Sequence, residues 1–136
     1  MSDSPDPSVL AAKVLARATA GLPAGVAVCD GVIPDTPTGP YVVLMNVEIT
    51  SLSQRYSQTR PNYHGNFSWL VVNNSPDGVR KMGAKLHALF DDLNKATPPT
   101  DGLFSWPDYN SGLITDDSIE GAWKHSDTHY FNGRTE

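Results

Sequence analysis

Two histidines spaced four residues apart are the side chains in this sequence whose pattern most suggests a metal site. In a helix, His125 and His129 would lie on one face and could share a metal ion. The surrounding stretch "HSDTHYF" has poor helix propensity, and in a strand the two rings lie roughly 13 Å apart at about 3.3 Å per residue. No third ligand stands at a telling position, so we predict no metal site.

Adjacent carboxylates are the next candidates, because acid and base catalysis often uses a pair of them. The doublets are Asp91-Asp92 and Asp116-Asp117. Neighbouring side chains point about 100° apart in a helix and to opposite faces in a strand, so neither doublet forms an acid and base pair. We predict that both lie on the solvated surface. His87 could partner a distant acid, although a lone histidine beside an apolar helix face is typical of a helix boundary.

Sequence motifs for nucleophilic catalysis and phosphate binding do not occur. The chain contains no G-x-S-x-G elbow, no G-x-x-x-x-G-K-[ST] loop and no G-x-G-x-x-G. A triad assembled from distant loops is still compatible with the sequence, because such sites are defined by geometry. The absence of motifs favours a protein without catalytic residues, and we predict no cofactor.

The composition favours a single domain, residues 1–136, that carries a negative charge. The net charge of -5 and the pI near 5.2 argue against a groove that grips nucleic acid, but they are compatible with DNA that slides past. The sequence shows no apolar run of membrane-spanning length and no signal peptide, so we expect no membrane contact and synthesis in the cytosol. Cys29 is the only cysteine, and we expect it to be a half-buried core residue.

The first half of the chain predicts a helix and two strands. Residues 8–22 have a helical apolar period, with Lys13 and Arg17 on the opposite side, and Gly21 and Pro23 end the helix. "GVAVCDGVI" is a short strand candidate. "YVVLMNVEIT" is nearly continuous in apolar residues, which predicts the middle strand of the sheet.

The second half predicts a strand, a helix and two further strands. "FSWLVVN" precedes a helix that Ser75 caps, and Gly83 within that helix indicates the close approach of a strand. The apolar positions expected to face the core are Val79, Met82, Leu86, Leu89, Phe90 and Leu93. Later strands are expected at 113–119 and near the end. The fold class that follows is α+β, an antiparallel or mixed sheet of four to five strands packed by two helices on one face.

Residues 51–66 are polar and have no helical period. This predicted loop contains Arg55, Tyr56, Arg60, Tyr63 and His64. Tyr and Arg are enriched where proteins meet partners, so we favour an interface over a plain loop.

The segments "VAVCDGVIPDTPTGPYVVL", "FSWLVVNNSPDGVRKMGAKLHALFDDL" and "THYFNG" together resemble the tail terminator or tail-completion proteins of long-tailed bacteriophages. The clearest matches are Gly31-Val32-Ile33-Pro34 and Pro40-Tyr41-Val42-Val43. The resemblance spans nearly the whole chain, except that residues 96–112 do not align. It implies a virion protein at the junction of tail and neck, in a ring of typically six subunits. Such a ring caps the finished tail tube, joins it to the head-neck connector protein, and lets DNA pass through its lumen without specific binding.

The resemblance also implies roles for side chains. The loop residues Arg55, Tyr56, Arg60, Tyr63 and His64 would face the tail-tube protein. A second group would lie between subunits, although burial in the subunit's own core is an open alternative for each of its members: Trp106, Tyr109, Trp123 and Tyr130.

Two other functions compete with the tail terminator. One is another neck or connector component. The other is a small α+β enzyme or ligand-binding domain, with Trp69, Trp106 and Tyr109 lining a pocket and His64 or His125 acting as acid or base.

Overall fold

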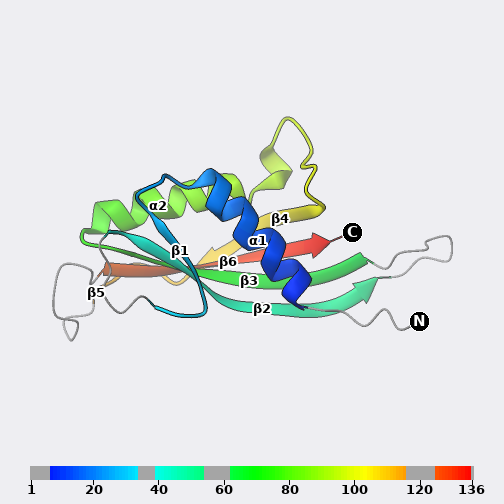
Figure 1. Ribbon diagram of the computed structural model, residues 1–136, viewed down its shortest axis with the longest axis horizontal. Helices are drawn as coiled ribbons and strands as arrows, with labels where there is room; N and C mark the ends of the chain where they lie inside the picture. The colour runs from blue at the N-terminus through cyan, green and yellow to red at the C-terminus, as the bar shows by residue number, and fades with distance from the viewer. Residues whose placement is uncertain (1–6, 34–38, 54–61, 116–124, 136) are drawn as a thin grey trace.

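The computed structural model describes residues 7–33, 39–53, 62–115 and 125–135, with side chains over 7–33, 39–49, 64–115 and 125–135 (Figure 1). In chain order the elements are α1 (Pro7–Gly21), β1 (Ala27–Asp30), β2 (Tyr41–Ser53), β3 (Asn62–Asn73), α2 (Pro76–Leu89), the short 3-10 helix η1 (Asp92–Asn94), β4 (Leu103–Asn110), β5 (Ile114–Thr115) and β6 (His125–Thr135).

The strands form one mixed sheet in the order β1-β2-β3-β6-β4, and the short β5 also pairs with β6. β1 runs parallel to β2, and the other pairings are antiparallel. The predicted α+β class is therefore confirmed, with six described strands rather than four to five. The predicted middle position of β2 is wrong. β3 takes that position because it pairs along its length with both β2 and β6, whereas β1 covers only the first four residues of β2.

Both helices pack on the same face of the sheet, as predicted (Figure 1). Alternate residues of β3 point toward them, since successive side chains of a strand point to opposite faces. Phe67, Trp69 and Val71 are almost completely buried there, against side chains of α1 and α2. The helical core residues are Leu10, Val14, Ala18, Val79, Met82 and Leu86.

The start of α2 follows its predicted capping signal, whereas its end differs from the prediction. The Ser75 side chain accepts a hydrogen bond from the Gly78 backbone N–H at 3.0 Å. The helix stops at Leu89, and the chain then turns, so that Phe90 is fully buried. The prediction that Leu93 faces the core is wrong, because its side chain is 65% exposed beyond the helix end.

Gly83 lies where a strand side chain approaches α2, as predicted. A Cβ at this position would lie 2.5 Å from His129 Nε2, which is shorter than a real contact allows. The helix can therefore approach β6 only because position 83 has no side chain.

The strand prediction was least accurate after η1. The main strand is β4, at Leu103–Asn110, and the strand expected at 113–119 is reduced to β5 at 114–115, with 116–119 outside the described residues. Pro107 lies inside β4. Proline is tolerated here because β4 is an edge strand, where one N–H needs no partner.

Candidate protein interface on the open face of the sheet

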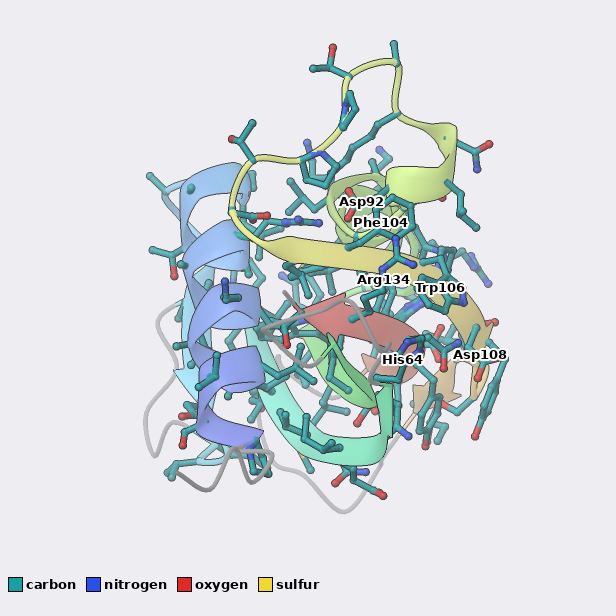
Figure 2. All side chains as sticks on the ribbon, turned by 90° about the vertical axis from the view of Figure 1, so that its right-hand side faces the viewer. His64, Asp92, Phe104, Trp106, Asp108 and Arg134 are labelled. Atoms are coloured by element: carbon teal, nitrogen blue, oxygen red, sulfur yellow. The ribbon has the colours of Figure 1, made fainter. Side chains whose placement is uncertain are left out.

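The sheet face opposite the two helices carries a set of aromatic and polar side chains at its β3–β6–β4 end. Strand register aligns them in rows: His64, Arg134 and Phe104 form one row, and Asn66, Asn132 and Trp106 form the next. Figure 2 shows His64, Trp106, Asp108 and Arg134 on the side of the sheet away from α1. We call this surface the open face and define it by these residues: His64, Asn66, Phe104, Trp106, Asp108, Tyr109, Tyr130, Asn132 and Arg134.

Contacts between aromatic rings and a guanidinium give the open face a fixed shape. The Arg134 guanidinium lies 4.8 Å from the centre of the Phe104 ring, an attractive cation–π arrangement. The Phe104 and Trp106 rings are 6.1 Å apart. Tyr109 and Tyr130 stack with their ring centres 4.3 Å apart, although Tyr109 is still 56% exposed. These rigid amphipathic side chains are the types that anchor protein interfaces.

A shallow hollow adjoins the open face where β4 begins. Its volume is about 280 Å³, and it is lined by Pro98, Pro99, Gly102, Leu103, Phe104 and Arg134. That volume is at the lower limit for small-molecule sites, and the lining contains one charged side chain and no acid and base pair.

The outer edge of β4 is closed to a further strand. Along this edge the outward backbone N–H groups belong to alternate residues. The Leu103 N–H donates to Asp101 Oδ1 at 3.2 Å, the Ser105 N–H donates to Asp92 Oδ2 at 2.8 Å, and Pro107 has no N–H. A strand of another molecule would find no free donor at these three positions. Partners must therefore approach β4 through its face.

The carboxylates that close this edge belong to a partly buried ion network centred on Arg17, in which the Asp101 side chain is 42% exposed. Its guanidinium donates to Asp92 at 2.8 Å, to Asp101 at 2.8 Å and to the Leu103 carbonyl oxygen at 2.8 Å. Lys95 pairs with the other Asp92 oxygen at 2.8 Å. The Asp92 side chain is 0% exposed, so the prediction that its doublet is solvated is wrong for this residue. The partner lies on α1, far away in the sequence, and sequence spacing could not reveal it.

The network shifts the pKa values of Asp92 and Arg17 toward the charged forms. Burial by itself raises the pKa of Asp92, but hydrogen bonds from Lys95 and Arg17 outweigh it and lower the value below its usual range. Burial likewise opposes the charge of Arg17, and hydrogen bonds to Asp101 and Asp92 outweigh it and raise the pKa of the guanidinium. The network therefore stays ionised and joins α1, η1 and β4.

A second polar cluster lies beneath α2. His87 Nε2 and His129 Nδ1 are 2.9 Å apart, and His129 Nε2 lies 3.4 Å from Asp127 Oδ2. Asn110 and Ser111 donate to the Asp127 carboxylate. Burial lowers the pKa of His129, a nearby Asp127 opposes this, and His87 adds to the lowering. The distant acid expected to partner His87 is Asp127, and His129 lies between the two side chains. The cluster is packed among core side chains, which favours a structural role.

The structure brings together some of the predicted interface residues. Trp106, Tyr109 and Tyr130 meet on the open face. Tyr63 and His64 lie in β3 rather than in a loop, and the side chain of Tyr63 is outside the described set. The remaining predicted residues, Arg55, Tyr56, Arg60 and Trp123, lie outside the described residues.

The pocket that the enzyme alternative requires does not form. Trp69 is 0% exposed in the helix-side core, whereas Trp106 and Tyr109 lie on the opposite face. His125 and His129 do lie in one strand, as predicted, and the hydroxyl of Thr115 is 2.9 Å from His125 Nδ1. Sequence reasoning missed Phe104, Arg134 and Asp108 as surface residues. The alternation in "LFSW", with Leu and Ser buried and the aromatics outward, was the available signal for Phe104.

The described residues contain neither a membrane-spanning helix nor a group of side chains that could hold a metal ion. Neither described helix has the length and apolar character to cross a membrane. In the same part of the chain, no three His, Cys, Asp or Glu side chains are grouped so that they could hold a metal ion.

Comparisons with known proteins support the fold. No family model matches the sequence, and no curated protein matches it. Among solved structures, the chain is similar to a chain from the structure "Virion of native gene transfer agent (GTA) particle". The TM-score is 0.55 at 16% identity, over 81% of this chain and 78% of that chain. Similarity at this level of identity is similarity of fold.

Proposed function

We propose that this chain is a structural protein of a phage-like virion, and that it caps the end of the tail tube as a ring and joins the tail to the head-neck connector. The proposal assigns it no catalytic reaction and no cofactor. The observation that carries it is the open face, where aromatic side chains and Arg134 gather on one side of the sheet. A surface of this composition is suited to docking other proteins.

The fold and the charge support the same proposal. The solved chain with a similar fold belongs to a virion particle. A ring subunit needs a stiff platform, and here both helices and the sheet share one core. The net charge of -5 is suited to a lumen through which DNA passes without binding.

The predicted site residues take roles in this assembly. Trp106, Tyr109 and Tyr130 of the open face lie between subunits, together with Trp123. The segment that connects β2 to β3 contacts the tail tube through Arg55, Tyr56 and Arg60, and the start of β3 contacts it through Tyr63 and His64.

The test uses tail-tube subunits encoded in the same genome. Tubes are assembled with and without the purified chain, and their lengths and ends are measured by negative-stain electron microscopy. A terminator stops elongation and adds a ring of density at one end. The double variant R55E/R60E should lose this activity. The control variant R80E reverses the charge at an exposed position of α2 and should keep it.

The alternative of a neck or connector component predicts a different result. The chain would then leave tube growth unchanged and bind the purified connector ring in sedimentation. Binding to neither tube nor connector would refute both functions.

A further inference from the structure

The open face has a charge pattern that is complementary to itself. Along β4, Phe104, Trp106 and Asp108 follow one another at steps of two residues, and Arg134 pairs in register with Phe104. The positive charge of Arg134 and the negative charge of Asp108 thus flank Trp106 on either side. β4 shifts register between Pro107 and Asn110, so Asp108 lies in an irregular part of the strand, and Figure 2 shows it on the same side of the sheet as Arg134 and Trp106.

Neither charge is neutralised within the part of the chain that the structure describes. No ion pair there involves Arg134 or Asp108. Arg134 contacts the Phe104 ring, and Asp108 is exposed (Figure 2). Both are therefore available to charges on another molecule.

We propose that two copies of the free chain pair open face to open face about a two-fold axis at Trp106. In this arrangement Arg134 of each copy lies against the partner's Asp108, and the two Trp106 rings meet at the axis. A two-fold interface requires that each contact occur twice with the roles exchanged. A positive and a negative group on either side of a central aromatic satisfy this requirement.

The closed edge of β4 determines the mode of pairing. Asp101, Asp92 and Pro107 leave no outward N–H free at the three positions, so β4 cannot extend the sheet into a second copy. Contact through the face places the aromatic rings in the centre and the charges at the sides. This is the usual division between the core and rim of an interface.

The pairing goes beyond the proposed function and does not depend on it. It concerns the free chain, and it uses Trp106, which the ring is proposed to use between subunits. The dimer would therefore cover the open face until a tail tube competes for the chain. A chain that caps tubes without forming this dimer, or the reverse, separates the two proposals.

The experiment is a charge exchange read by sedimentation equilibrium. The wild-type chain should be a dimer whose dissociation constant rises with salt. R134D and D108R each create two like-charge contacts in a homodimer. Each should weaken pairing about 100-fold, taking about tenfold for each of the two contacts. The double variant R134D/D108R should recover the wild-type affinity, and an equimolar mixture of the two single variants should form a heterodimer.

Matched controls separate this interface from general charge effects. R80D and D30R change the net charge equally at exposed positions on α2 and β1, and should leave the dimer unchanged. W106A should weaken pairing and leave the unfolding midpoint of the chain nearly unchanged. Circular dichroism confirms that each variant is folded.

Three results would overturn the proposal. The first is a wild-type chain that stays monomeric up to its solubility limit. The second is a dimer that is indifferent to R134D and D108R. The third is a dimer that V32K disrupts while the charge exchange does not, because Val32 is 71% exposed beside β1 and that result would assign pairing to the opposite edge of the sheet.

Discussion

Replacing Asp92 by Asn tests whether the buried ion network holds β4 to the rest of the fold. The Asp92 carboxylate has no exposed surface and accepts from Arg17 and from the Ser105 N–H at 2.8 Å each. Removing one partner of a buried ion pair costs about 3–5 kcal/mol. Arg17 keeps its second partner, Asp101, at 2.8 Å, which places the expected loss at the lower end, about 3 kcal/mol. This is a large fraction of the roughly 5–15 kcal/mol that stabilises a typical domain.

The assay is urea unfolding followed by tryptophan fluorescence, because Trp69 is fully buried in the folded chain. The matched control is D77N, which removes an exposed ion pair between Asp77 and Lys81 at 3.0 Å and should cost less than about 0.5 kcal/mol. A loss below about 1 kcal/mol for D92N, or one equal to that of D77N, would refute the reasoning.

The pH dependence of D92N provides a second reading of the same network. The pKa of Asp92 is lower in the folded chain than in the unfolded chain, where it is 3.8. The contribution of the Asp92 carboxylate to the free energy of unfolding is therefore complete above the unfolded pKa and is lost as pH falls through the lowered folded pKa. Wild-type stability should therefore fall more steeply in acid than that of D92N. Parallel curves for the two proteins would contradict this assignment.

Three further predictions concern packing, capping and a buried histidine. G83A should lower the unfolding free energy by about 1–2 kcal/mol in urea titrations, because the new methyl group would lie 2.5 Å from His129. This clash should outweigh the better helix propensity of alanine. A stabilised variant would contradict the close approach of α2 and β6. S75A should cost about 1 kcal/mol in the same assay by removing the hydrogen bond from the Gly78 N–H, and S75D should retain most of the stability. Burial lowers the pKa of His129, so stability should fall as pH drops below 6.5, where the unfolded histidine takes up a proton that the folded one resists. In H129Q this decline between neutral and mildly acidic pH should be smaller, and urea midpoints measured over that range will show whether it is.

Local signals were sufficient for the elements whose periodicity is strong. The capped start of α2, its apolar positions up to Leu86 and the close approach at Gly83 were all predicted from neighbouring residues, because capping and helical period depend on spacings of three and four. The prediction failed at Leu93, where the period continued in the sequence but the helix did not. A turn that buries Phe90 competes with one more helical turn, and tertiary packing decided between them.

The candidate site was predictable only in part. Trp106, Tyr109 and Tyr130 were chosen as interface types, and the structure adds that they share one face. Arg134 and Asp108 were not selected, because nothing near them in the sequence marks them. Their importance arises from the pairing of β4 with β6, which unites residues about thirty positions apart.

The sequence by itself determined the α+β class, the capped start of α2, the net negative charge and the absence of a catalytic motif, since each depends on composition or on contacts within one turn. Tertiary structure alone decided the strand order, the burial of Asp92 and the placement of Arg134 over Phe104. These features join segments far apart in the chain. Their stability comes from removing apolar surface from water, and the charges buried with it are tolerated because they are paired. A local pattern carries no record of which distant segment will share that burial.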